Sequence, residues 1–110
     1  MAAAEPEIEP AVTVAITPEF TFDPPEVTIR AGEAVEWRNA GRSPQTVTGD
    51  PARVRVDGAV SLPEGAVPWD SGVLNNGETF VYAFDTPGEY VYVSLPQAEN
   101  GMTGRVVVEP

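Results

Sequence analysis

The side chains best placed to carry out chemistry lie in the stretch 90–102, which reads Tyr-Val-Tyr-Val-Ser-Leu-Pro-Gln-Ala-Glu-Asn-Gly-Met. Its first four residues alternate as in a strand, a loop with Pro, Asn and Gly follows, and a β-branched segment at 105–109 comes next. A loop between two final strands lies at one end of a β-sandwich, where side chains from several strands converge. This placement is typical of a metal site, but the chain contains no Cys and no His, the usual ligands of transition metals.

Other catalytic and metal-binding patterns are also missing. Ser94 has no His to act as its base, so a hydrolytic triad is excluded. Asp50, Asp57 and Asp70 lack the spacing of a calcium loop, with its central Gly and terminal Glu. We therefore expect no catalytic residue, no enzymatic activity and no site for a hard metal ion.

Short alternating segments separated by turns must position these side chains. Twelve prolines and ten glycines interrupt the chain and leave no window with helical periodicity. The expected strands are marked by Val12/Val14/Ile16 with Phe20 and Phe22, Val27/Ile29, Val35/Trp37, 45–48, Val54/Val56, Phe80/Tyr82/Phe84, Tyr90/Tyr92 and 105–109. Strands of this length and turn spacing predict an all-β fold, an antiparallel sandwich or barrel of about eight strands.

The aromatic residues are expected to serve packing. We interpret Tyr82, Tyr90 and Tyr92 as core and cross-strand contacts and Trp37 as a core residue. Trp69 lies beside a loop, so we expect its side chain to be partly exposed.

Length and charge narrow the classes of partner. The 110 residues make one domain, expected at 11–110, after a flexible acidic leader at 1–10 that lacks the features of a signal peptide. No apolar run is long enough to span a membrane. Six basic residues, all Arg, against 17 acidic ones give a net charge of −11, which argues against nucleic acid or anionic membranes as partners. We interpret the acidic charge as favouring solubility and expect a monomer. The alternative is that this charge steers the protein toward a basic partner.

Several short segments follow one another between Val12 and Val108 in a recognisable order. They are Phe-Thr-Phe at 20–22 before Pro-Pro, Gly-Glu at 32–33, Val-Glu-Trp-Arg-Asn at 35–39, Ser-Pro-Gln-Thr-Val-Thr at 43–48, Asp-Ser-Gly-Val-Leu at 70–74, Gly-Glu-Thr-Phe at 77–80, Pro-Gly-Glu-Tyr at 87–90 and Gly-Met-Thr-Gly at 101–104. Their order and spacing resemble those of the cupredoxins, the blue-copper family of plastocyanin, amicyanin, pseudoazurin and halocyanin. The resemblance implies a Greek-key β-sandwich, one-electron transfer through one copper ion, redox proteins as partners, and an exported (periplasmic, lumenal or extracellular) origin.

The resemblance also assigns the copper-ligand positions to Gln45, Ser94, Gln97 and Met102, where the family has His, Cys, His and Met. The spacing Ser94-x2-Gln97-x4-Met102 is kept, but only the weak axial Met remains. A Ser hydroxyl stays protonated near neutral pH, and a Gln amide oxygen is a poor donor for copper. We therefore predict a chain without copper or any other cofactor, inactive in electron transfer.

The replacements leave several interpretations open. Because they are neutral and nearly isosteric, we favour deliberate removal of the ligands over a natural copper-less branch that acts as an interaction or structural module. In that branch, the family's apolar docking patch would lie around Pro44, Pro96, Gln97 and Met102. A scaffold engineered to carry a new site is a third interpretation. If the four positions serve only structure, Ser94 caps a strand end with its hydroxyl bonded to a loop amide, Gln45 and Gln97 are rim amides, and Met102 fills the core.

Overall fold

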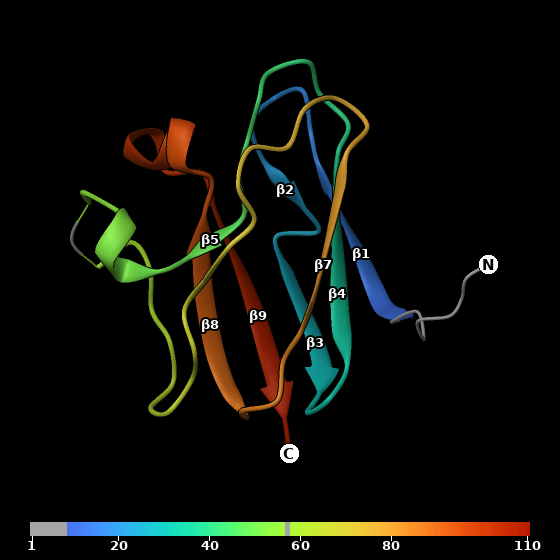
Figure 1. The fold of residues 1–110 in the computed structure, drawn as a ribbon, viewed down its shortest axis with the longest axis vertical. Helices are drawn as coiled ribbons and strands as arrows, with labels where there is room; N and C mark the ends of the chain where they lie inside the picture. The colour runs from blue at the N-terminus through green and yellow to red at the C-terminus, as the bar shows by residue number, and fades with distance from the viewer. Residues whose placement is uncertain (1–8, 57) are drawn as a thin grey trace.

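The computed structural model describes residues 9–56 and 58–110 and contains two packed β-sheets (Figure 1). One sheet has the order β2-β1-β4-β7 and the other the order β3-β9-β8-β5-β6. The strands of the first sheet are β1 (Pro10–Ile16), β2 (Phe22–Asp23), β4 (Ala34–Asn39) and β7 (Thr79–Ala83). Those of the second are β3 (Glu26–Arg30), β5 (Thr48–Gly49), β6 (Trp69–Asp70), β8 (Gly88–Val93) and β9 (Thr103–Glu109). Two short 3-10 helices, η1 (Pro51–Arg53) and η2 (Leu95–Asn100), complete the described elements, and the all-β sandwich prediction is confirmed.

The strand pairing is mixed, which corrects the expectation of a purely antiparallel fold. β1 runs parallel to β4, with Val14 beside Trp37, and β3 runs parallel to β9, with Thr28 beside Val107. Between the two members of each pair the chain visits the opposite sheet, and such long crossovers are what parallel strands require. Regular turn spacing sets the lengths of the segments, but it does not show which of them pair.

The core lies between the sheets and is built from the alternating apolar residues. The predicted pairs Val27/Ile29 and Val35/Trp37 are buried, as are Tyr90 and Tyr92. Each large apolar side chain contributes about 1.5–3 kcal/mol when it is fully removed from water. The main cluster consists of Val14, Ile16, Phe22, Val27, Ile29, Val35, Trp37, Val47, Trp69, Leu74, Phe84, Tyr90, Tyr92, Met102, Val106 and Val108.

Trp69 is buried, only 6% exposed, which corrects the expectation that it lies partly in solvent. Its indole ring stacks on Tyr82 with ring centroids 5.0 Å apart. The residue opposite Trp69 in the β5–β6 pair is Gly49, and a Cβ there would lie 2.3 Å from the indole ring. Because Gly49 has no side chain, the indole can cover the end of the core.

Two further strand assignments were wrong. Phe20 does not extend the first apolar series: it has φ 65° and is 41% exposed in the turn between β1 and β2. Val54 and Val56 form no strand: Val54 is the C-cap of η1 and Val56 follows in a bend. Asp50 caps the start of η1 by accepting the N–H of Ala52 at 3.0 Å. The segment 45–48 contributes a strand only from Thr48, with Gln45 in an isolated bridge to Leu74.

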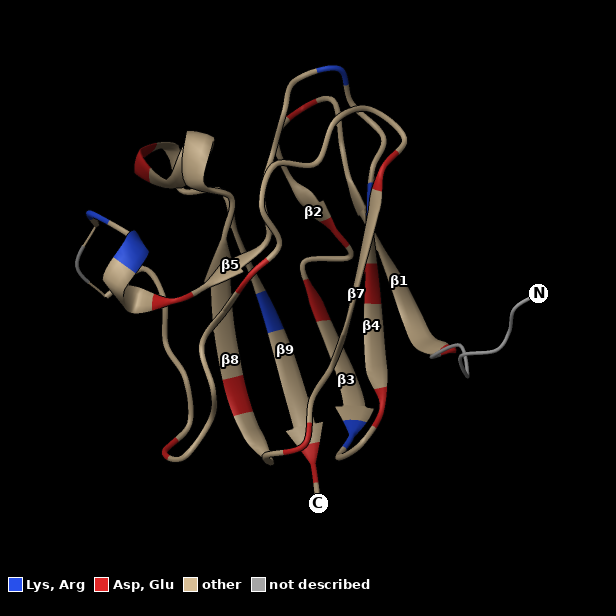
Figure 2. Cartoon of the chain, in the orientation of Figure 1, with Lys and Arg blue, Asp and Glu red and all other residues tan. Residues whose placement is uncertain are grey.

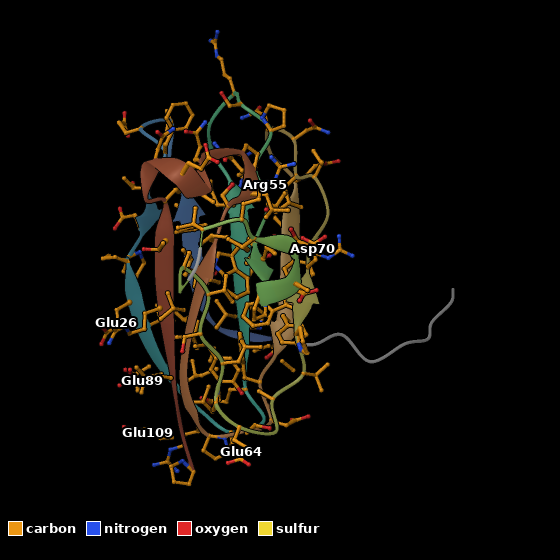
Figure 3. The ribbon with its side chains drawn as sticks, turned by 90° about the vertical axis from the view of Figure 1, so that its left-hand side faces the viewer. Glu26, Arg55, Glu64, Asp70, Glu89 and Glu109 are labelled. Atoms are coloured by element: carbon orange, nitrogen blue, oxygen red, sulfur yellow. The ribbon has the colours of Figure 1, made fainter. Side chains whose placement is uncertain are left out.

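The outer face of the five-stranded sheet carries charged side chains. Arg105 of β9 lies 3.3 Å from Glu89 of β8 and 3.9 Å from Glu26 of β3, and Figure 3 shows both Glu side chains pointing away from the body of the protein. These ion pairs are exposed, so each contributes at most about 1 kcal/mol. Acidic residues are spread over most elements (Figure 2).

Residues 1–8 and 57 are not among the described ones. Most of the predicted leader at 1–10, and the predicted loop residue Asp57, therefore lie outside this description. The first strand starts at Pro10, one residue before the expected domain start. Within the described ranges, no helix has the length and apolar character needed to cross a membrane.

Candidate functional site

The residues singled out in the sequence come together where β8 and β9 leave the sandwich. Ser94 follows the last residue of β8 and is the N-cap of η2, while Met102 directly precedes β9. The Ser94 N–H donates to the Met102 carbonyl at 3.3 Å, so the two ends of the loop are joined. Gln45 arrives from the segment before β5, held by paired backbone bonds with Leu74 of 3.1 and 2.7 Å.

The loop from Ser94 to Met102 is closed by its own backbone. The N–H of Gln97 donates to the Ser94 carbonyl at 3.0 Å, and the N–H of Met102 donates to the Gln97 carbonyl at 3.2 Å. Pro96 lies in the first turn of η2, where its missing N–H costs no hydrogen bond. Gly101 ends the helix with φ 82°, a left-handed conformation that glycine adopts without strain.

Ser94 and Gln45 bind each other directly inside the protein. The Ser94 hydroxyl donates to Gln45 Oε1 at 2.6 Å, and both side chains are buried, 0% and 2% exposed. The same hydroxyl oxygen accepts the N–H of Thr46 at 3.0 Å. Ser94 therefore does bond a loop amide as expected, but Gln45 is a core residue and the expectation of a rim amide was wrong for it.

A row of hydroxyl groups extends this network toward the surface, and sequence reasoning missed it. Thr46 Oγ1 accepts the N–H of Leu95 at 2.8 Å and lies 2.8 Å from Thr48 Oγ1. The Thr48 hydroxyl donates to Asp70 Oδ1 at 2.7 Å, and Asp70 Oδ2 lies 3.7 Å from Arg53. The sequence signal was available, because residues 46 and 48 are two apart and so share one face of an extended segment.

Gln97 and Met102 depart from this arrangement. Gln97 is half-buried, and its Oε1 accepts a bond from Asn100 Nδ2 at 2.7 Å within the same loop. Met102 is 4% exposed and its side chain belongs to the main core cluster, as expected of a gap-filling residue. Of the four positions, the structure joins Gln45 and Ser94 by side chains and brings Met102 beside Ser94 by its backbone.

The surface at this end of the molecule is smaller than the predicted docking patch. Pro44 and Pro96 are exposed and Gln97 is half-buried, but Met102 is buried and cannot contribute to a contact surface. Beside the loop lies a hollow of about 360 Å³, with this lining: Arg53, Val54, Arg55, Val56, Leu95, Pro96, Ala98 and Glu99.

Comparison with known proteins relates this architecture to a family. Residues 9–109 match the family described as copper binding proteins, plastocyanin/azurin family. The chain belongs to this family, the cupredoxins. It is 36% identical over 94 residues to the chloroplastic plastocyanin of Tetradesmus obliquus, covering 82% of this chain and 59% of that one. It is 33% identical to the plastocyanin of Scenedesmus fuscus, covering 82% of this chain and 88% of that one.

Other cupredoxins give the same result. The halocyanin of Natronomonas pharaonis is 35% identical over 91 residues, and this chain spans 49% of its length. A Cu(I) form of an amicyanin variant superposes with a TM-score of 0.70 at 26% identity, covering 92% of this chain and 84% of the amicyanin. The family and fold implied by the sequence resemblance are thus confirmed.

The side chains present at the four positions do not fit copper. Ser94 offers a protonated hydroxyl and Gln45 an amide oxygen, and these two groups already satisfy each other. In the described ranges, Trp69 Nε1 is the only fully enclosed side-chain nitrogen or oxygen without a hydrogen-bond partner. The same ranges contain no group of three His, Cys, Asp or Glu side chains placed to hold a metal.

Proposed function

We propose that this cupredoxin is an electron-transfer scaffold whose copper site has lost two His and one Cys, leaving it copper-free and redox-inactive. The observation that carries the proposal is the 2.6 Å hydrogen bond from Ser94 Oγ to Gln45 Oε1. A thiolate and an imidazole in these places would share a copper ion, whereas a hydroxyl and an amide bind each other. No catalytic residue and no replacement cofactor form part of the proposal.

We attribute the loss to deliberate removal of the ligands. Each replacement is neutral and close in shape to the ligand it replaces, and the spacing from Ser94 to Met102 is kept. The alternative is a natural copper-less domain that acts as an interaction or structural module. Exposed Pro44 and the exposed Pro96 of η2 favour that alternative, because they leave a small apolar surface at the loop end.

The biological setting follows from the family. We propose redox proteins as the partners of the parent protein and an exported or lumenal origin, since the similar plastocyanin of Tetradesmus obliquus is chloroplastic. A monomer without nucleic-acid or membrane contacts is consistent with the net charge of −11.

Copper titration tests the proposal. Cu(II), and Cu(I) under reducing conditions, should give no stoichiometric binding by calorimetry and no intense visible absorption band. Tight binding of one ion per chain, or a blue colour, would contradict it.

Restoring the ligands tests the origin of the site. The triple variant Gln45→His, Ser94→Cys, Gln97→His should bind one Cu(II), turn blue and undergo reversible reduction, because the loop spacing is kept. The double variant Gln45→His, Gln97→His, without the thiolate, serves as the matched control and should stay colourless. A folded but colourless triple variant would mean that the loop has been remodelled, which favours the natural module.

A further inference from the structure

Of the four strands at sheet edges, β7 differs from the other three. β2 and β6 have two residues each, and β3 has Glu26 and Arg30 at its ends. β7 has five residues, Thr-Phe-Val-Tyr-Ala, with no charge and no Pro. Short length, charges and Pro are the usual means of stopping an edge strand from pairing with another chain, and β7 has none of them.

Hydrogen bonds at both ends of β7 show how it is joined to β4. The N–H of Asn39 donates to the Glu78 carbonyl at 3.0 Å, just before β7 begins. The N–H of Phe84 donates to the Glu33 carbonyl at 3.0 Å, just after β7 ends. Both bonds lie in the register of the β4–β7 pair, so they fix which residues of the antiparallel ladder are hydrogen-bonded.

In such a ladder every second residue bonds to the neighbouring strand. Phe80 and Tyr82 therefore direct their backbone groups to β4, and their side chains pack against the core. Thr79, Val81 and Ala83 direct their backbone N–H and C=O groups to the open edge. Within the described ranges, no backbone hydrogen bond from another segment engages these three residues.

Charge at the two ends of β7 indicates the kind of segment that fits. Glu78 precedes the strand and Asp85 follows it, while the strand itself is drawn uncharged in Figure 2. A hollow of about 70 Å³ adjoins the end of β7, with Val67, Ala83 and Asp85 in its lining. Val67 is 67% exposed and adds an apolar wall. An uncharged segment with basic residues at its ends complements this edge.

We propose that β7 accepts an extended peptide as an additional strand, with uncharged residues along Thr79–Ala83 and Lys or Arg beyond both ends. Backbone bonds to the open edge would provide affinity, and the acidic flanks would select basic partners. A second copy of this chain is a weaker fit, because it carries the same net charge of −11. The inference does not depend on the fate of the copper site.

Hydrogen exchange tests the open edge. In the protein alone, the amides of Thr79, Val81 and Ala83 should exchange fast, and those of Phe80 and Tyr82 slowly. A synthetic peptide of alternating Val and Thr with two Arg at each end should slow the exchange of the first three amides. Slow exchange of Val81 in the protein alone would show that its edge is covered and would overturn the proposal.

Val81→Pro is the decisive variant, because it removes only an outward N–H and leaves the ladder with β4 intact. Val81→Thr keeps the N–H and is the matched control. The Arg-flanked peptide should bind Val81→Pro roughly tenfold more weakly than either the unmodified protein or Val81→Thr. Circular dichroism and thermal unfolding verify that both variants are folded; if Val81→Pro is not, the exchange experiment decides.

Changing the charge at the ends of the peptide, and the salt concentration, distinguishes a basic peptide from other possible occupants of the β7 edge. A peptide with Glu in place of Arg should bind at least about tenfold more weakly, and added salt should weaken binding of the Arg peptide. Equal binding of both peptides would overturn the charge selection. Dimers of this chain that become more stable as salt is added, and that do not form in Val81→Pro, would assign the edge to a second copy instead.

Discussion

At the residue scale, the Ser94 hydroxyl connects the two segments that meet at the end of the sandwich. It donates to Gln45 and accepts from the Thr46 amide, and all of these atoms lie away from solvent. A buried group that loses its partner costs more than the bond itself contributes, because the remaining group is neither solvated nor paired. In this structure Ser94 therefore has a structural role.

Removing this hydroxyl should destabilise the protein. Ser94→Ala leaves Gln45 Oε1 without its donor and the Thr46 N–H without its acceptor, so we expect a loss of about 1–3 kcal/mol in the free energy of unfolding. Gln97→Ala is the control, since its half-buried amide accepts a bond from Asn100 within the same loop, and we expect a change within about 0.5 kcal/mol. Urea unfolding measures both, and equal losses would contradict the assignment.

At the element scale, β8 and β9 approach each other most tightly where a tyrosine lies opposite a glycine. Tyr92 of β8 lies opposite Gly104 of β9, and a Cβ on Gly104 would lie 2.3 Å from the Tyr92 hydroxyl oxygen. That hydroxyl accepts the indole N–H of Trp37 at 2.9 Å across the core. The absence of a side chain at 104 thus lets Tyr92 lie over β9 and reach the opposite sheet.

A methyl group at this position should disturb both sheets. Gly104→Ala forces the Tyr92 ring to move and strains its bond with Trp37, so we expect a loss of about 1–3 kcal/mol in unfolding free energy. Thr103→Ala changes an exposed residue of the same strand and should stay within about 1 kcal/mol. Thermal unfolding checks the difference, together with the near-ultraviolet circular dichroism of the aromatic residues. An unchanged Gly104→Ala spectrum and stability would count against this packing.

At the scale of the whole molecule, aromatic residues from both sheets form one continuous cluster. Trp37 of the first sheet contacts Tyr92 of the second at 5.3 Å between ring centroids, and Trp69 stacks on Tyr82. Burial raises the pKa of Tyr92 well above the ordinary 10.0, although the Trp37 N–H bond acts in the opposite direction. Burial also raises the pKa of Tyr82 and of Tyr90. Ionisation of Tyr92 is therefore coupled to opening of the core.

The sign of this coupling predicts alkaline unfolding. Below about pH 10 both states keep Tyr92 protonated, and above it only the unfolded chain releases the proton. The unfolding free energy should then fall by about 1.4 kcal/mol per pH unit for Tyr92. Urea unfolding at a series of pH values measures the slope, which should be smaller in Tyr92→Phe. Phenolate absorbance from Tyr92 that appears before unfolding would contradict the prediction.

The sequence by itself determined the fold class, the family and the missing donors. The alternation of apolar and polar residues places Val27, Val35 and Trp37 on the inward faces of their strands, whichever strands pair with one another. The absence of Cys and His is read directly from the composition. Only the tertiary structure decided the parallel pairing of β1 with β4 and the burial of Trp69, because both depend on contacts between segments far apart in the chain. The bond between Ser94 and Gln45 spans 49 positions and arises only when the sandwich brings its loop ends together.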